Sequence, residues 1–562
     1  MSPARALLVA LSLVAAACSA GAPAARRSPE PGGGSPSVAP TASTRMEEVA
    51  CGLPAPWILR IARGYHPERS AELQILPREP NFVGAGLPHV GPWTYTSHVP
   101  MFWYGPGHIE PSGRVRRAAT LADIAPTQAR MLGLDFPTPD GKPLTEALVQ
   151  DPSGPPKLIV TVIWDGAGRH VLDEWRGRWP NLRRLLPEGA WYEEAFAGSS
   201  PTSSAQGHGI IGTGTFPRTH GLVGHSIRIG DRIVPPWRTG PDLLLRPTLA
   251  DLWMQETGGR AKAGLLGTVG IQLGMLGHGS AWEGNPKPLV VLREAPDAET
   301  LGAEGTRWNL PEHLLEFYRF PGYANDLPEL AGYFPDMDRR DGQADGTWRG
   351  HALDDEVIQG GFQTPARIPY QTRLLEEVIE RERFGEDDVT DLLFVNYKLI
   401  DQLGHIFSMN SEEMGDAVEV QDEHLPTLID LLDRLVGRGE WAMVITADHG
   451  STPSPEVSGA FQISSTELHQ RLNGAFDRDD DDRPVVQQVK QTEIFVDTEE
   501  LAEHGGTLEE MAEYVMDLRQ EDTAIPDVSN VTDPSARVFQ AAFPAEIIPG
   551  LPCLPEDIGA SG

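Results

Sequence analysis

The chain has 562 residues, of which 40% are hydrophobic, and a formal net charge of −34 at pH 7. This length exceeds that of a typical single domain, so it fits either one large domain with insertions or two domains. The negative charge would repel a phosphate backbone, which excludes nucleic acid as an expected partner.

The first 48 residues have the composition of a targeting signal followed by a tether. Arg5 precedes the apolar run ALLVALSLVAAA, which is too short to span a bilayer and ends directly before Cys18. This pattern resembles a bacterial lipobox, in which the signal 1–18 is removed and Cys18 is lipidated; an ordinary secretory signal is the alternative. Residues 19–48, rich in Pro, Ser, Gly and Ala, predict a flexible tether. We therefore expect an extracytoplasmic protein that contacts the membrane only through a lipid anchor, or a secreted one.

Further along the chain, short apolar runs alternate with amphipathic stretches, which predicts an α/β fold with a mostly parallel central sheet and helices on both faces. The predicted core strands are 71–76, 99–105, 157–164, 391–397 and 442–447. The predicted helices are 120–133, 367–384 and 414–437. Residues 135–156, rich in Pro, Gly and Asp, predict a linker.

Two regions have weaker periodicity and predict inserts into this fold. Residues 225–365 are rich in Gly and Pro and predict a cap or substrate lobe. Residues 460–545 predict a second, mixed insertion, with a strand at EIFVD and a helix at 507–519. The two cysteines that remain after the signal, Cys51 and Cys553, lie at opposite ends of the mature chain. An oxidising compartment permits a disulfide between them, and two inert thiols are the alternative.

Side chains that bind metals follow three of the predicted strands. Asp165 comes after KLIVTVIW, and Asp448 and His449 come after AMVITA. Asp401 and His405 are four residues apart beyond LLFVNY. Carboxylates at the carboxyl ends of core strands face the crevice in which open α/β sheets bind ligands, and Asp and His are ligands of zinc. Each segment alone fits a turn or a surface loop, but together they predict a metal-dependent hydrolase.

Ser204 lies in SSPTSSAQGHGIIGTGTFPRTHGL, where a Ser/Thr cluster precedes a Gly-rich apolar run. This predicts a hydroxyl at a helix N-terminus, where the N–H groups and the helix dipole favour an alkoxide or a bound phosphate. A metal beside such a serine makes it a competent nucleophile. Taken alone, the cluster is an ordinary helix N-cap.

The segments VIWDG, PTSSAQGHGIIGTGTFPRTHG, IDQLGH and ITADHG, in this order, resemble the alkaline phosphatase superfamily, and in particular its nucleotide pyrophosphatase/phosphodiesterase-like branch. The resemblance implies an alkaline phosphatase-like α/β/α sandwich and a site with two divalent ions, expected to be zinc. It implies a Ser204 nucleophile and two groups of metal ligands. The first group is Asp165, Asp448 and His449 together with Ser204, and the second is Asp401, His405 and one further histidine.

In the family that further histidine lies in a late segment, and nothing after His449 resembles it. A similar sequence stands near the N-terminus instead, in GLPHVGPWTYTSHVPMFWYGPGHI followed by TLADIAPTQARMLGL. The resemblance aligns His89 with the missing ligand and His98 with a histidine that is not a ligand. It therefore implies that the chain is circularly permuted.

In this interpretation 50–134 is the family's C-terminal segment, and 135–156 joins it to the remainder of the catalytic domain, 157–553. Such a permutation costs little folding free energy when the chain ends lie close together at the surface. It would also bring the new ends together and give Cys51 and Cys553 a reason to pair.

Departures from the family pattern bear on the substrate. The family's phosphate-binding Asn falls on or near His225, and His208 and His278 are further candidates for substrate contact. The Lys/Arg pair of many phosphomonoesterases has no match in 265–279, and no sulfatase motif surrounds Ser204. We therefore expect hydrolysis of a small-molecule phosphate ester, with phosphodiesters or pyrophosphates favoured. The alternatives are a phosphomonoesterase of the alkaline phosphatase type and a non-catalytic envelope lipoprotein that uses the fold for binding. The sequence indicates no protein partner.

Overall fold

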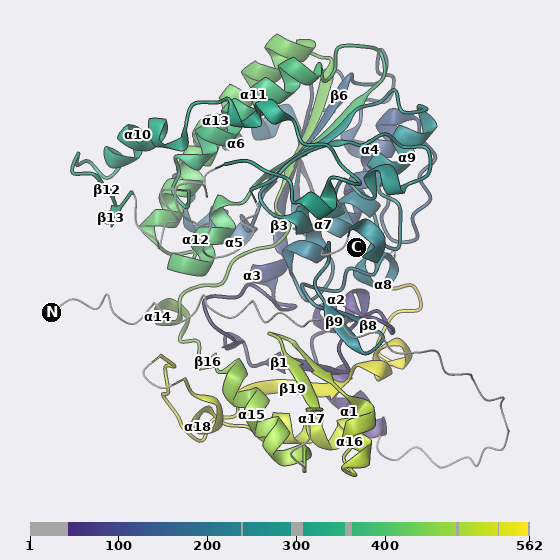
Figure 1. The fold of residues 1–562 in the computed structure, drawn as a ribbon, viewed down its shortest axis with the longest axis vertical. Coiled ribbons are helices and arrows are strands. Elements are labelled where there is room, and N and C mark those ends of the chain that lie inside the picture. Colours follow the sequence, from purple (N-terminus) through teal and green to yellow (C-terminus); the bar gives the residue numbers. More distant parts are fainter. Residues whose placement is uncertain are drawn as a thin grey trace.

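The computed structural model describes residues 43–237, 240–293, 307–353, 362–478, 483–525 and 528–559. The predicted signal 1–18 with Cys18, and residues 19–42 of the predicted tether, lie outside the described residues. Two parts share the described chain, a larger α/β part and a smaller part that lies below it in Figure 1. In the described residues, no helix has the length and apolar character needed to cross a membrane.

A nine-stranded sheet forms the centre of the larger part, in the order β11-β10-β14-β6-β15-β3-β7-β4, with β5 beside β7. The strands from β11 to β15 in this order are parallel to their neighbours, whereas β3 is antiparallel to both β15 and β7. β6 and β14 are buried throughout, as expected of strands covered on both faces. The strands are β3 His98–Tyr104, β4 Gly113–Val115, β5 Ala119–Thr120, β6 Leu158–Trp164, β7 Ala190–Phe196, β10 Ala263–Leu266, β11 Leu289–Val291, β14 Asp391–Tyr397 and β15 Trp441–Thr446.

Helices cover both faces of this sheet, which confirms the predicted α/β sandwich. Helices α6, α11 and α13 lie on one side, and α4 and α9 lie on the other (Figure 1). The helices of this part are α3 Thr94–Ser97, α4 Ile124–Leu132, α5 Arg169–Glu174, α6 Pro180–Leu185, α7 Ser204–Thr213, α8 Pro217–His220, α9 Leu249–Glu256, α10 Phe334–Asp338, α11 Arg367–Glu382, α12 Leu399–Phe407, α13 Glu412–Leu432 and α14 Pro455–Ser458. The three predicted helices correspond to α4, α11 and α13. α4 begins later than predicted because a 3-10 turn at Leu121–Asp123 precedes it, and it ends where Gly133 turns left-handed at φ 66°.

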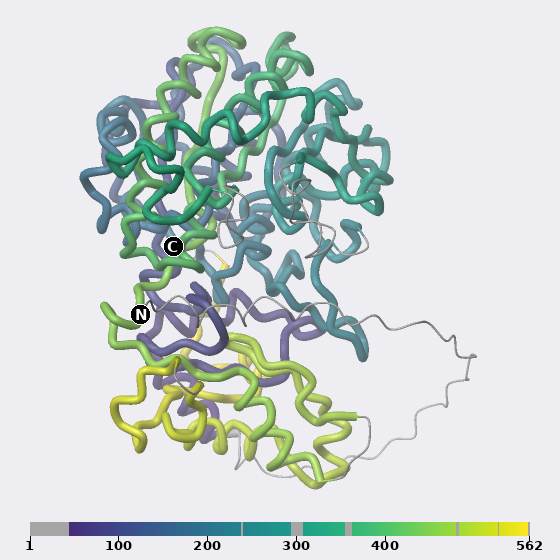
Figure 2. Tube along the Cα trace, turned by 60° about the vertical axis from the view of Figure 1, so that its left-hand side comes forward, coloured from purple at the N-terminus to yellow at the C-terminus, as the bar shows by residue number. Residues whose placement is uncertain are grey.

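The smaller part is built from both ends of the described chain. Its antiparallel sheet has the order β17-β18-β1-β19. Figure 2 shows the N-terminal segment in purple running through the yellow and light green C-terminal segments. The elements are α1 Ser43–Cys51, α2 Ala55–Gly64, β1 Leu73–Pro77, α15 Ser465–Phe476, β17 Val486–Val489, β18 Glu493–Val496, α16 Thr498–Glu503, α17 Leu508–Asp517, α18 Gln520–Thr523 and β19 Phe539–Pro544. These elements bury an apolar core of their own.

Three short pairs of strands lie outside the two sheets. β2 pairs with β16 in parallel, whereas β8 with β9 and β12 with β13 form antiparallel pairs. Their bounds are β2 Phe82–Val83, β8 Ile227–Ile229, β9 Arg232–Val234, β12 Thr347–Trp348, β13 His351–Ala352 and β16 Gln462–Ile463.

The structure corrects three predictions about the organisation of the chain. The strand predicted at 71–76 exists as β1, but it belongs to the smaller antiparallel sheet, because its partners β18 and β19 come from the region predicted as an insertion. Residues 43–48 are not tether but part of α1, whose Met46 is buried in the smaller core. The region 225–365 is not only a lobe, because β10 and β11 form one edge of the central sheet. At four and three residues, these strands are too short to show a period.

The segment 135–156 is a packed connection rather than a loose one. It contains only a short 3-10 turn, Thr145–Ala147, but Leu144 is fully buried. The buried Asp140 accepts a hydrogen bond of 2.8 Å from the backbone N–H of Phe216 and forms an ion pair with Arg218. The segment is therefore tied to the loop and helix that follow α7.

A disulfide joins the two ends of the smaller part. The Sγ atoms of Cys51 and Cys553 are 2.01 Å apart, although the residues are separated by 502 positions in the sequence. Cys51 is the last residue of α1, so the bond attaches this helix to the segment that follows β19.

Candidate metal and catalytic site

Six of the predicted ligands form two groups at the carboxyl end of the central sheet. Within each group, one ligand atom from each residue lies within 4.8 Å of the others. The first group is Asp165, Asp448 and His449, and the second is His89, Asp401 and His405. Strands β6, β15 and β14 precede five of these residues, all except His89, and are neighbours in the sheet, so their carboxyl ends meet at one edge.

His89 reaches the site from the loop between β2 and α3, near the N-terminus. Its ring stacks on that of His449, with centroids 3.6 Å apart, and its Nε2 lies 3.1 Å from Oδ1 of Asp401. Its Nδ1 lies 3.0 Å from the carbonyl oxygen of Thr202, to which it can donate a hydrogen bond. The structure therefore brings His89 to the second group, whereas His504 lies in the smaller part just after α16.

Backbone carbonyls orient both stacked imidazoles. The Nδ1 of His449 lies 2.9 Å from the carbonyl oxygen of Gly450, as that of His89 lies beside Thr202. With Nδ1–H donating to a carbonyl, Nε2 carries the lone pair and faces the carboxylates. Metal-binding histidines are commonly held in this way by a backbone acceptor.

Two carboxylate oxygens of the site are buried without a hydrogen-bond donor in the described chain, Oδ1 of Asp401 and Oδ2 of Asp448. The other oxygen of Asp448 accepts hydrogen bonds of 3.1 Å from the backbone N–H groups of Gly166 and His449, which fixes the carboxylate. An unpartnered buried carboxylate oxygen is costly unless a cation satisfies it. Each group therefore fits a divalent cation with carboxylate and imidazole ligands, as zinc prefers.

Ser204 is the first residue of α7 and is only 1% exposed. Its Oγ lies 3.1 Å from Nε2 of His449, so the predicted hydroxyl at a helix N-terminus faces the first group. The helix approaches the ligands closely because Gly207 has no side chain: a Cβ there would lie 2.8 Å from Cβ of Asp448. The first turn of α7 therefore presents Ser204 and its free N–H groups to the site.

Lys398, which the sequence analysis did not single out, lies between the two groups. Its Nζ donates hydrogen bonds of 2.8 Å to Oδ1 of Asp165 and to Oγ of Ser204, and lies 2.8 Å from Oδ2 of Asp401. Burial lowers the pKa of Lys398, but Asp165, Asp401 and Asp448 outweigh burial and raise it above its ordinary value. A sequence signal for Lys398 was present, since it directly follows an apolar strand as Asp165 does.

The carboxylates of Asp448 and Asp401 differ in their affinity for protons. Burial and, after it, the charge of Asp165 raise the pKa of Asp448 to about 6. Burial also raises the pKa of Asp401, but Lys398 and then His405 outweigh it and hold the pKa well below its usual range. At neutral pH the site therefore holds a cluster of negative charge that favours cations.

His208 supports the ligands from behind and does not face the crevice. It is fully buried, and its Nε2 accepts a hydrogen bond of 2.8 Å from Nδ2 of Asn396. The same Nδ2 donates to Oδ2 of Asp165 at 2.9 Å, and Gln272 donates to Oδ1 of Asn396 at 2.6 Å. The prediction of substrate contact by His208 is therefore not met. Asn396 was missed by sequence reasoning, although a lone amide inside an apolar strand is a usable signal.

The other two candidates for substrate contact lie in different places. His225 is exposed, and desolvation, followed by the charges of Lys398 and His89, lowers its pKa. It therefore lies close to the site and is open to solvent. The side chain of His405 is 43% exposed and also reaches solvent.

His278 is not part of the site. Its Nδ1 lies 2.7 Å from Oδ2 of Asp251, and its Nε2 lies 2.8 Å from the carbonyl oxygen of Leu244. Because Asp251 belongs to the capping box at the start of α9, Nδ1 of His278 serves to hold that helix in place, and Nε2 ties the ring to the segment before it.

A buried arginine borders the site on the side of β10. Arg367, the first residue of α11, donates a hydrogen bond of 2.5 Å to Oε1 of Gln402 and another to Oγ1 of Thr268. Within the described ranges it forms no ion pair with a carboxylate, and burial lowers its pKa well below the usual value. Thr268 belongs to 265–279, the segment in which the sequence lacks a Lys/Arg pair. Arg367 therefore supplies a cation beside that segment from another element.

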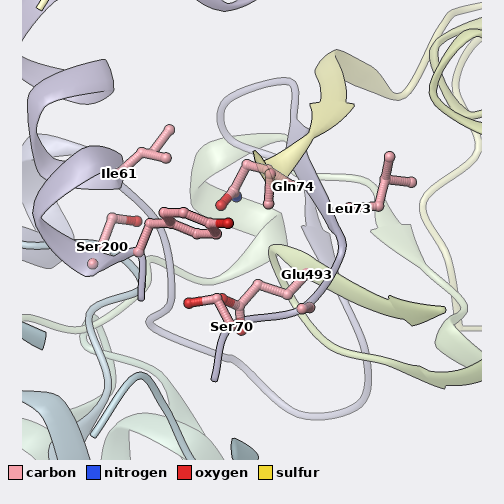
Figure 3. Close-up of a pocket in the computed structure, with 10 residues that line it drawn as sticks. Ile61, Ser70, Leu73, Gln74, Ser200 and Glu493 are labelled. Atoms are coloured by element: carbon pink, nitrogen blue, oxygen red, sulfur yellow. The ribbon is translucent and has the colours of Figure 1, made fainter. Parts of the chain in front are cut away.

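A further buried acid lies between the two parts of the molecule. Figure 3 shows Glu493 beside Ser70 in a small cavity that is also lined by Gln74 and Ser200. Burial raises the pKa of Glu493 from its ordinary 4.5 to about 8. Between these pH values the folded chain binds one proton more than the unfolded chain, so the free energy of unfolding falls as the pH rises through this window.

Glu493→Gln should remove this pH dependence. Relative to the variant, the wild-type protein should lose on the order of 4 kcal/mol of stability between pH 5 and pH 8, since one pKa unit corresponds to about 1.4 kcal/mol. Urea unfolding at the two pH values measures this difference, with the exposed Glu503→Gln as the control. Parallel stability curves for the wild-type protein and Glu493→Gln would show that Glu493 is ionised in the folded state.

The known proteins that resemble this chain are phosphodiesterases and alkaline phosphatases. The family model for type I phosphodiesterase / nucleotide pyrophosphatase matches residues 159–551, a range that contains every ligand of the two groups except His89. The alkaline phosphatase PafA of Elizabethkingia meningoseptica is 24% identical over 452 residues, which are 70% of this chain and 78% of that protein. The alkaline phosphatase PhoK of a Sphingomonas species is 24% identical over 362 residues, which are 57% of this chain and 59% of that protein.

A solved structure shows the same fold. The crystal structure of wild-type PafA superposes with a TM-score of 0.50 at 19% identity, covering 69% of this chain and 84% of that one.

Proposed function

Because the chain belongs to the type I phosphodiesterase / nucleotide pyrophosphatase family and is therefore a phosphoric ester hydrolase, we propose that it acts through Ser204 as the nucleophile. The observation that carries this proposal is the position of the Ser204 hydroxyl. Its Oγ lies at the start of α7, 3.1 Å from Nε2 of His449 and 2.8 Å from Nζ of Lys398, which itself contacts one carboxylate of each ligand group.

We propose two divalent ions, zinc by the choice of ligands, in the two groups. Asp165, Asp448 and His449 would hold the first, and His89, Asp401 and His405 the second. When bound, such ions supply Lewis-acid stabilisation of charge on the attacking and leaving oxygens. The unpartnered oxygens of Asp401 and Asp448 support this assignment.

The residues of the chain then perform a double displacement. Oγ of Ser204 loses its proton and bonds to phosphorus while the bond from phosphorus to the leaving oxygen breaks, and the leaving group takes up a proton. Water next attacks the phosphoserine, the bond from phosphorus to Oγ breaks, and Ser204 regains its proton. The free N–H groups at the start of α7, where Ser204 stands, would stabilise negative charge on the phosphoryl oxygens.

We propose phosphodiesters or pyrophosphates as the preferred substrates, as the absence of a Lys/Arg pair in 265–279 favours. A second candidate, a phosphomonoesterase, is favoured by Arg367. Its buried guanidinium contacts Thr268 and could serve the additional negative charge of a monoester. The names of the alkaline phosphatase relatives agree with this second candidate.

Metal analysis and a substrate panel test the proposal. The purified chain should contain about two zinc ions and should hydrolyse bis-p-nitrophenyl phosphate faster than p-nitrophenyl phosphate. The reverse order of rates would favour the monoesterase. A chain without metal and without turnover on any mono-, di- or pyrophosphate ester would instead be the non-catalytic binding protein.

We further propose that the chain works outside the cytoplasm, anchored through a lipidated Cys18. The disulfide between Cys51 and Cys553 supports an oxidising compartment, since disulfides are rare in the cytosol. We also propose that the catalytic domain is circularly permuted. The entry of His89 into the second ligand group, from a segment that precedes the matched range 159–551, supports this proposal.

A further inference from the structure

Lys398 occupies the centre of the ligand cluster. Its ammonium contacts Asp165 of the first group and Asp401 of the second, each at 2.8 Å, and its side chain is only 9% exposed. Oδ1 of Asp165 also lies 3.7 Å from Nε2 of His449, so Lys398 uses the carboxylate oxygen that faces the other ligands of the first group. The ammonium and a divalent ion in that group therefore need the same oxygen.

The charges decide when Lys398 is stable in this place. Asp165, Asp401 and Asp448 are fully buried or nearly so, and together they offer three negative charges. In the absence of other cations, Lys398 neutralises one of them and holds the carboxylates together. Two divalent ions would bring four positive charges, and like charges a few ångströms apart repel strongly in a buried site. Lys398 thus favours the metal-free site and opposes the loaded one.

The flexible side chain of Lys398 can move its ammonium out of the cluster while its backbone stays in place. Lys398 is the residue at the N-cap of α12, so its main chain is fixed, while four methylene groups carry the ammonium. On the same helix, the side chain of His405 is 43% exposed while its Nε2 lies 3.5 Å from Oδ1 of Asp401, so this side of the cluster reaches solvent. A displaced ammonium therefore has the solvent-facing side of the site within reach.

We propose that Lys398 is a built-in cation that competes with a divalent ion for Oδ1 of Asp165 and, through its charge beside Oδ2 of Asp401, opposes an ion in the second group. It holds the metal-free site together and weakens metal binding, and it leaves the two carboxylates when the ions bind. This inference rests on the metal site of the proposed function.

Lys262, which directly precedes β10, offers a matched control. Its Nζ lies 3.2 Å from Oδ2 of Asp391, at the opposite end of β14 from Lys398. It therefore forms a Lys–Asp pair of the same kind, away from the ligands. Lys262→Met should affect stability but not metal affinity.

Zinc affinity, measured by competition with a chromophoric chelator, tests the proposal without any assay of activity. Lys398→Met should bind zinc about tenfold more tightly than the wild-type protein, or tighter still. In EDTA the Tm of Lys398→Met should fall below that of the wild-type protein, and saturating zinc should remove the difference. Lys398→Arg, which keeps the charge, should stay within about threefold of the wild-type affinity.

Each outcome has a distinct meaning. An unchanged or weaker zinc affinity in Lys398→Met, with the wild-type protein binding zinc, overturns the role of Lys398 and leaves the proposed function standing. If Lys398→Met does not fold in EDTA, the affinity of Lys398→Gln refolded with zinc decides in the same way. The absence of zinc binding in the wild-type protein and in all variants overturns the proposed metal site and this inference together.

Discussion

Ser204→Ala should reduce kcat/KM for bis-p-nitrophenyl phosphate by at least about 10³-fold, because the variant lacks the attacking oxygen. The variant should still bind zinc, since the carboxylates and imidazoles of both groups remain. Steady-state kinetics and metal content, measured on the same preparation, provide the check.

Ser203→Ala is the matched control for this variant. Ser203 is the N-cap residue of α7 and its Oγ lies 3.4 Å from Oε1 of Gln206, with no contact to a ligand. Its activity should stay within a few-fold of the wild-type value. Nearly full turnover in Ser204→Ala would exclude Ser204 as the nucleophile. A second readout is the phosphoserine itself, which rapid quenching with a labelled substrate should trap on the peptide that contains Ser204.

His89→Ala should remove one zinc ion per chain and lower kcat/KM by at least about 10²-fold, because the second group would keep only Asp401 and His405. The imidazole also stacks on His449, so its loss weakens the packing between the two groups. Zinc content and kinetics measure the effect, and the Tm shows whether the variant remains folded.

His504→Ala tests the alternative position of the last ligand. His504 follows Ser204 and both Asp401 and Asp448 in the chain, but its Nε2 lies 3.0 Å from Oε1 of Glu500, on α16 in the smaller part. Its removal should leave zinc content and activity unchanged. If His504→Ala lost a zinc ion and His89→Ala kept both, the assignment of His89 and the proposed circular permutation would be wrong.

The sequence predicts the parts of the site that are local in the chain. Asp165, Asp448 and Asp401 each follow an apolar strand, and neighbouring parallel strands place their ends together. His89 is different, because no local pattern connects it with residues so far along the chain. Only the resemblance to a family motif identified it.

Sequence reasoning missed residues whose role depends on tertiary contacts, or assigned them to the wrong place. Lys398 and Asn396 act through side chains from other strands, which no spacing within β14 reveals. His278 has the residue type of a substrate ligand, but Asp251 and the start of α9 engage it. The fold shows the same limit: the apolar pattern of β1 predicts a strand, but not whether its partners lie in the central sheet or in the smaller one.

The pairing of β1 with β19 has a consequence for the order in which the protein can be completed. Leu73 faces Pro544 and Ile75 faces Ala542. One of the first strands to leave the ribosome therefore cannot pair with β19 until one of the last segments has been synthesised. During synthesis the early strand exposes an unpaired edge and apolar side chains such as Ile75. Such edges invite association with other chains. We therefore expect the nascent chain to need a chaperone or rapid export until its final segment has emerged.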